Sequence, residues 1–168
     1  MKSLVIYFSH TGDNYFGGHI QNITKGNTEI VAEYIQEFTG ADLFKVEGVK
    51  PYPTDYQECC DVALNEKNSN ARPEIKKNLS SIDDYDIIYI GSPVWWGYPP
   101  MPLLTQLEKL DFSGKIVKPF TTHEGSGLGS VMSVYKQVCK GADIKPGLAI
   151  KGSAVKNSKK SVENWIKQ

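Results

Sequence analysis

The chain has 168 residues and a mass of 18.7 kDa, the size of one domain, and its 40% hydrophobic and 23% charged residues are ordinary for a globular protein. Lysine and arginine number 19 together, as do aspartate and glutamate, so the net charge is zero and gives no reason to expect nucleic-acid binding. No apolar run approaches the roughly 20 residues that cross a membrane, and the three cysteines lack metal-site spacing, so we expect a cytoplasmic protein with free thiols and no metal.

The predicted elements alternate between strand and helix from one end of the chain to the other. Residues 3–9 are a continuous apolar run typical of a strand covered on both faces, and residues 27–39 have apolar positions at helical spacing up to Gly40. In chain order, the same patterns then predict a strand at 41–46, a helix at 54–66, strands at 86–90 and 115–122 with a helix at 100–109 between them, a helix at 127–138, a strand at 143–150 bent near Pro146 and Gly147, and a helix at 158–166.

This alternation predicts an α/β fold of three layers, in which helices cover both faces of a parallel sheet within one domain spanning residues 1–168. Five strands and right-handed crossovers favour the order 2-1-3-4-5. In such a sheet ligands bind beyond the carboxyl ends of the strands, at the point where the winding reverses. The loops after Ser9, Gly91 and Thr122 are therefore the places to look for function.

The first loop has the composition of a site for a phosphate monoester. Ser9, His10 and Thr11 follow the first strand, and Asn27 and Thr28 begin the next helix. Hydroxyl groups and free backbone N–H groups at a helix N-terminus donate hydrogen bonds to phosphate, and the helix dipole favours its negative charge. The same residues would also serve simply as helix caps, and His10 would pair with a phosphate only when protonated.

The second loop is rich in aromatic side chains between glycines and prolines. Trp95 and Trp96 stand together after the buried third strand, where their faces would cover a planar ring while backbone groups bind its polar edge. Packing of one tryptophan on the core is the alternative. Tyr52 and Tyr56, in the segment after the second strand, would border a substrate pocket or pack on the sheet.

The third loop, residues 121–129, contains three glycines, of which Gly125 and Gly127 allow the backbone to approach a ligand closely. His123 and Glu124 are its titratable groups. A histidine here would bond the edge of a ring or donate a proton to a substrate, or would simply face water.

Taken together, these loops resemble those of the flavodoxin family over nearly the whole chain. Residues 7–12 (YFSHTG) with 26–28 (GNT) are similar to its phosphate loop, and residues 91–97 (GSPVWWG) and 122–127 (THEGSG) to its two ring-binding loops. The resemblance implies a flavodoxin-like fold that binds FMN. It implies the following cofactor-binding residues: for the phosphate end Ser9, His10, Thr11, Asn27 and Thr28, and for the ring Pro93, Val94, Trp95, Trp96, Gly97, Thr122, His123, Glu124, Gly125, Ser126 and Gly127.

The chain departs from the family pattern in the phosphate loop. Residues 13–26 separate the Thr-Gly pair from the Asn-Thr pair, which are contiguous in the family. Asn14 and Asn27 are both candidates for the family's asparagine, and we favour Asn27 because Thr28 and a clear helix follow it. The insertion, with Tyr15 and Ile20, is expected to form a flap near the site or to pack on the surface.

Two functions fit the sequence. The resemblance implies an FMN-binding redox protein that carries electrons between partner proteins. The neutral charge, where many electron-carrying flavodoxins are acidic, and the long segments 13–26 and 51–82 point to the alternative of an oxidoreductase that uses NAD(P)H to reduce a quinone-like small acceptor. A phospho-receiver module is excluded, because the strand ends hold Ser9 and Ser92 where clustered aspartates are needed.

Overall fold

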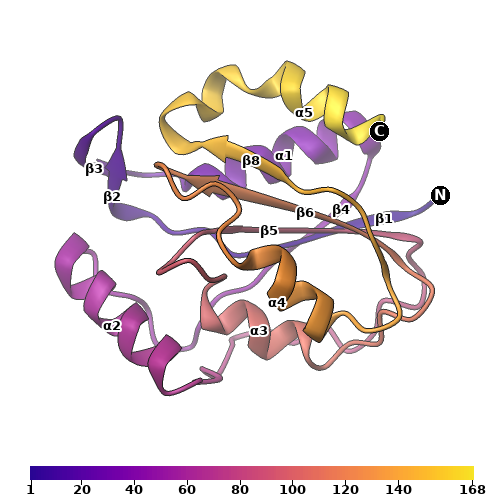
Figure 1. Ribbon diagram of the computed structural model, residues 1–168, viewed down its shortest axis with the longest axis horizontal. Coiled ribbons are helices and arrows are strands. Elements are labelled where there is room, and N and C mark those ends of the chain that lie inside the picture. The colour runs from indigo at the N-terminus through magenta and orange to yellow at the C-terminus, as the bar shows by residue number, and fades with distance from the viewer.

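In the computed structural model, which describes all residues 1–168, a parallel sheet separates two layers of helices (Figure 1). The strands pair in the order β4-β1-β5-β6-β7, with β8 also paired to β6. The fold class predicted from the sequence is confirmed, and the five expected strands correspond in chain order to β1 (Ser3–Tyr7), β4 (Asp42–Lys45), β5 (Ile87–Pro93), β6 (Ile116–His123) and the pair β7 (Asp143–Ile144) and β8 (Leu148–Lys151).

The alternating side chains of β1 explain why both faces of the sheet are covered. Leu4 and Ile6 point into one hydrophobic cluster, and Val5 and Tyr7 into the other. The helices on the two sides are α3 (Met101–Leu107) and α4 (Val131–Val138) below the sheet in Figure 1, and α1 (Asn27–Thr39), the short 3₁₀ helix η1 (Gly152–Asn157) and α5 (Lys159–Ile166) above it. None of these helices is long and apolar enough to cross a membrane.

Two helices begin later than the sequence indicates. Helix α2 (Tyr56–Asn68) begins after Asp55, whose carboxylate accepts a hydrogen bond from the backbone N–H of Glu58 at 3.0 Å and so caps the helix. Helix α4 begins at Val131 rather than near residue 127. Gly127 and Gly129 have φ angles of 61° and 51°, which a right-handed helix cannot contain.

The predicted fifth strand is broken rather than bent. Residues 145–147 separate β7 from β8, while only Lys118 and Pro119 lie opposite them on β6. Pro119 and Pro146 have no N–H group to donate, so a regular ladder cannot continue there and a bulge takes its place.

The inserted segment forms an antiparallel β-hairpin, β2 (Gly12–Phe16) and β3 (His19–Ile23), which the strand and helix prediction missed. Gly17 and Gly18 make its turn with φ angles of 65° and 94°. A pair of glycines between two extended segments is a recognised hairpin signal, because both turn positions need positive φ. The hairpin stands apart from the sheet at the left of Figure 1, above α2.

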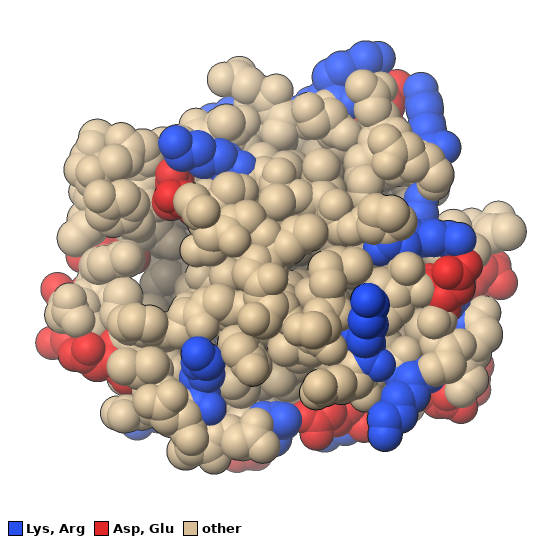
Figure 2. All heavy atoms as spheres, in the orientation of Figure 1, with Lys and Arg blue, Asp and Glu red and all other residues tan.

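Charged side chains are dispersed over the surface. Figure 2 shows lysines and arginines interspersed with aspartates and glutamates around a broad uncharged area. At the left of this view the surface is hollowed where Figure 1 has the hairpin above, α2 below and the ends of β5 and β6 to the right.

Candidate functional site

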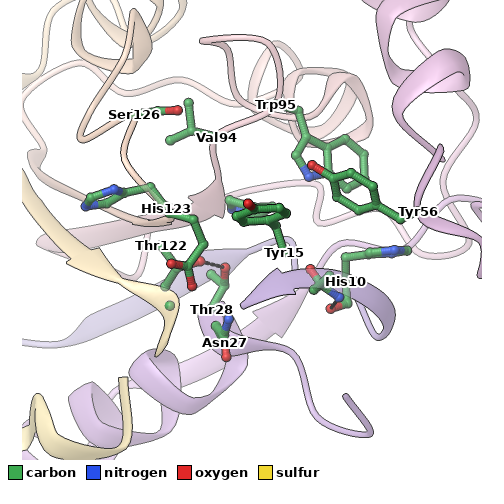
Figure 3. Close-up of a pocket in the computed structure, with 14 residues that line it drawn as sticks. His10, Tyr15, Asn27, Thr28, Tyr56, Val94, Trp95, Thr122, His123 and Ser126 are labelled. Carbon is green, nitrogen blue, oxygen red and sulfur yellow. Dashed lines mark hydrogen bonds between the residues drawn. The ribbon is translucent and has the colours of Figure 1, made fainter. Parts of the chain in front are cut away.

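The hollow lies at the carboxyl edge of the sheet, where β1, β5 and β6 end side by side. It contains a cavity of about 330 Å³, within the range of roughly 300–1,000 Å³ usual for small-molecule sites. Figure 3 shows that its walls come from all three loops. The predicted cofactor-binding residues that line it are His10, Asn27, Thr28, Pro93, Val94, Trp95, Thr122, His123, Glu124 and Ser126.

One end of the cavity is the N-terminus of α1. The backbone N–H of Glu29 donates to Ser9 Oγ at 3.1 Å, and the N-cap residue, Gly26, makes no side-chain cap. The N–H groups of Asn27 and Thr28 have no acceptor within the helix, because no helical carbonyl precedes the first turn. A Cβ on Gly26 would lie 2.0 Å from Ser9 Oγ, so glycine lets the helix end approach the first loop. Free amides at a positive helix end suit an anion.

A buried hydroxyl pair joins this helix end to β6. Thr28 Oγ1 and Thr122 Oγ1 are 2.8 Å apart, and both side chains are almost fully buried. Thr121, the neighbour of Thr122, donates its hydroxyl to the carbonyl of Gly127 at 2.9 Å and so holds the third loop against the strand. The phosphate-loop and third-loop residues predicted from the sequence are therefore in direct contact.

The two titratable residues of the third loop have different surroundings. His123 Nδ1 accepts a hydrogen bond from the N–H of Gly125 at 2.9 Å, so the neutral ring carries its proton on Nε2. Partial burial lowers the pKa of His123, an effect that the nearby carboxylate of Glu124 opposes. Glu124 Oε1 accepts from the N–H of Ser153 at 2.9 Å, which ties the loop to η1.

The second loop is a tight turn with an unusual residue in it. The backbones of Trp95 and Tyr98 exchange hydrogen bonds of 2.8 and 3.0 Å, and the turn residues Trp96 and Gly97 have φ angles of 54° and 80°. Positive φ is rare for a bulky residue. Helix α2 supports this conformation, because Trp96 Nε1 donates to the carbonyl of Cys60 at 3.0 Å.

Trp95 is the aromatic wall of the cavity. Its ring packs edge-on against Phe8 and Tyr52, with centroids 5.2 and 4.9 Å away, so it also contributes to the core. Trp95 therefore packs on the core, as the alternative interpretation expects, and also lines the cavity, while Trp96 lies outside this cavity and is 49% exposed. That their faces cover a planar ring stays a prediction.

His10 lies beside the aromatic group rather than at the helix end. Its ring is 5.6 Å from that of Trp95, and Nε2 is buried without a hydrogen-bond partner. Burial lowers the pKa of His10, partly opposed by Asp13, so the ring is neutral at pH 7. In Figure 3 the ring points away from Thr28. These features do not favour an ion pair between His10 and a phosphate.

Several cavity residues were not among the predicted cofactor ligands. They are Asn14, Tyr15, Tyr56 and Gly152. The ring of Tyr15, from the hairpin, lies 6.1 Å from that of Tyr56 at the start of α2, and Figure 3 shows Tyr15 above Thr28. A Cβ on Gly152 would lie 2.5 Å from Asn27 Nδ2, so this glycine makes room for Asn27. Tyr56 was already considered as a pocket residue, but no sequence signal indicates Gly152.

Some predicted residues lie outside the cavity walls. Ser9 lies against the N-terminus of α1, and Thr11 is exposed to solvent. Gly125 and Gly127 shape the third loop through their positive φ angles. Trp96 and Gly97 line a second, adjoining cavity. The cysteines, Cys59, Cys60 and Cys139, are all free.

Comparison with known proteins agrees with the sequence resemblance over most of the chain. The family model described as flavodoxin matches residues 18–168. No curated protein matches.

Solved structures cover the whole domain. A protein of Bacteroides uniformis named as a candidate flavoprotein is 29% identical, with a TM-score of 0.76, and the match covers 99% of this chain and 98% of that one. A flavoprotein from Lactobacillus acidophilus, solved in complex with FMN, is 26% identical with a TM-score of 0.63, covering 93% and 97%. Flavodoxin 2 from Bacillus cereus, at 18% identity and a TM-score of 0.54 over 99% of both chains, shares the fold. With a family model that matches nearly its whole length, the chain belongs to the flavodoxin family.

Proposed function

We propose that this protein binds FMN in the cavity at the carboxyl edge of the sheet and carries electrons between partner proteins. The observation that carries the proposal is the arrangement of that cavity, which has free helix amides at one end and Trp95 at the other. The phosphate would bind the amides of Asn27 and Thr28, and the ring would lie between residues 93–97 and 122–127. The Lactobacillus acidophilus relative, which was solved with FMN, supports this assignment.

The residues present fit the chemistry of this cofactor. No lysine or arginine lines the cavity, but an N-terminal helix end stabilises a phosphate without one. The hydroxyl of Ser9 accepts from Glu29 and keeps its own hydrogen free to donate. Bound FMN would supply one- and two-electron chemistry, while the protein supplies binding and electrostatics.

The chain's own residues would exclude water and leave an electron route open. Tyr15 and Tyr56 cover the cavity from the hairpin and from α2. Trp96, half exposed in the ring-binding loop, is the apolar group at which a protein partner would approach. With a net charge of zero, that approach would depend little on long-range electrostatic steering.

The free thiols support action in a reducing compartment such as the cytoplasm.

A second candidate function is that of an oxidoreductase that uses NAD(P)H to reduce a small acceptor. The second cavity, which shares Trp95 and Val94 with the first, favours it as a place for the small acceptor beside the flavin. Anaerobic addition of NADPH to the FMN-loaded protein separates the two functions. Rapid bleaching of the flavin absorbance would indicate the oxidoreductase, and a stable oxidised spectrum would indicate a carrier that is reduced by another protein.

Titration of the apoprotein with FMN, followed by visible absorbance, tests the proposal itself. Thr28→Val keeps the side-chain shape but removes a hydroxyl next to the proposed phosphate, so we expect binding to weaken by about 1–3 kcal/mol. Thr105→Val is the matched control. The hydroxyl of Thr105, on α3, donates to the carbonyls of Pro73 and Met101, and Thr105 does not line the cavity. Absence of FMN binding by the wild type, or equal FMN affinity in all three proteins, would contradict the assignment.

A further inference from the structure

A second cavity of about 340 Å³ adjoins the proposed FMN site. The two cavities share the wall formed by His10, Asn14, Tyr56, Val94, Trp95 and Ser126. Beyond this wall the second cavity extends under α2, where Cys59 and Ala63 are buried, and reaches the turn at Trp96. It contains none of the residues at the N-terminus of α1, so it is not the phosphate end of the site.

The walls of this cavity are suited to a flat, apolar molecule. Trp95 and Trp96 from the turn face Ala63 and Cys59 from the helix, and Tyr56 closes one side. Aromatic walls favour planar rings, which stack or pack edge-on against them. An occupant would therefore lie beside the same tryptophan that we assign to the flavin ring.

One buried polar atom in this cavity lacks a partner. His10 Nε2 is shielded from solvent and makes no hydrogen bond in the structure. An unpaired buried polar group destabilises the protein, and a ligand that bonds to it removes that cost. The amide group of Asn14 is already engaged, donating to the carbonyls of His10 and Gly12 at 3.2 Å. Because His10 lines the cavity, a small turn of its ring would bring Nε2 to a carbonyl or hydroxyl group of a ligand.

The charges around the cavity exclude an anionic occupant. Asp13 lines it, and no lysine or arginine does. The phosphates of a nicotinamide dinucleotide would have no cation to bind there, and Asp13 would repel them.

We propose that the second cavity binds a neutral, planar aromatic carbonyl compound of the quinone class, whose carbonyl oxygen bonds to His10. Neutral imidazole suits both redox forms of such a compound, because a ring nitrogen donates to a carbonyl in one tautomer and accepts from a hydroxyl in the other. This inference rests on the FMN binding proposed above, since an acceptor site has a use only beside bound FMN, and it supports the second candidate function, reduction of a small acceptor.

The test is calorimetric titration of the oxidised, FMN-loaded protein with 2-methyl-1,4-naphthoquinone. Ala63→Phe fills the cavity from α2, and Cys60→Phe fills it from a half-buried position should the first variant fold poorly. Val62→Phe adds the same ring at an exposed position of the same helix that lines neither cavity. We expect the filled variants to bind the naphthoquinone at least tenfold more weakly than the wild type and Val62→Phe, with FMN affinity within twofold in every protein.

A charged analogue adds a second arm. 1,4-Naphthoquinone-2-sulfonate has the same ring system and a negative charge, and we expect it to bind at least tenfold more weakly than the neutral probe. No binding of the neutral probe by the wild type, or unchanged binding in the filled variants, would overturn the inference. Parallel loss of FMN and naphthoquinone affinity in Ala63→Phe would assign this cavity to the flavin itself. Failure of the wild type to bind FMN would instead defeat the proposed function, and the preceding FMN titration detects it separately.

Discussion

Ser9 in the first loop and Trp95 in the second each have the structural role that the simpler sequence interpretation expects, and each stays available to a ligand. Ser9 caps α1 by accepting from the N–H of Glu29, as the simpler interpretation expects, yet its hydroxyl hydrogen stays free for a ligand. Trp95 likewise packs on Phe8 and lines the cavity. A helix end or an aromatic cavity wall must be held in place by the fold before it can bind a ligand. One side chain can therefore stabilise the fold and still be available for binding.

His10 gives a prediction about the dependence of stability on pH. Burial lowers its pKa in the folded protein, so between that lowered value and about 6.5 the unfolded chain binds more protons than the folded one. The free energy of unfolding should therefore fall as the pH drops from 7 through this window. Urea unfolding of the apoprotein at pH 5, 6, 7 and 8 measures it, and His10→Gln should flatten the profile. His123 contributes with the same sign, so some slope should remain. A His10→Gln profile parallel to that of the wild type would exclude His10 as the source.

Among the elements, the hairpin is the one that distinguishes this chain from the family pattern. Its strands pair Tyr15 with Ile20, but only Tyr15 lines the cavity and contacts Tyr56. The hairpin is joined to the rest of the fold at its base, where the N–H of Asp13 donates to the carbonyl of Thr54 at 3.0 Å. It thus lies over the cavity, near the site as one of the two sequence interpretations expects.

Tyr15→Ala should speed the release of FMN. The substitution removes the ring that covers the cavity, and we expect the dissociation rate to rise about tenfold, equivalent to about 1.4 kcal/mol. Stopped-flow displacement of FMN measures this rate. Ile20→Ala is the matched control, because Ile20 lies opposite Tyr15 in the same hairpin, is 51% exposed and lines neither cavity. Equal release rates in the two variants would show that the hairpin does not cover the ligand.

At the scale of the whole molecule, the sheet and the hydrophobic clusters on its two faces keep the three loops in fixed positions relative to one another. Gly91 of β5 lies against Phe120 of β6, where a Cβ would be 2.0 Å from the phenyl ring. Phe120 is fully buried in the cluster that includes α1 and α5. The strands that carry the second and third loops therefore require a glycine at this point.

Gly91→Ala should destabilise the fold without touching either cavity. Overpacking of a core typically costs about 1–3 kcal/mol, and urea unfolding at constant pH measures the change. Gly91→Ala combined with Phe120→Leu should recover part of the loss, because the smaller side chain makes room for the added methyl group. No recovery in the double variant would mean that the cost arises elsewhere in the strand.

The sequence alone determined the fold class, the three loops that meet at the cavity and most of the cavity wall, because buried strands and amphipathic helices have local patterns and parallel strands end at one edge. Tertiary structure decided what depends on distant segments meeting: the pair of Thr28 with Thr122, the room that Gly152 leaves for Asn27, and the cavity under α2. It also decided that Trp95 and Trp96 lie in different surroundings. Helix α2 supports a positive φ at Trp96 that no local preference favours. Contacts between residues far apart in the chain leave no periodic signal, so only the folded structure reveals them.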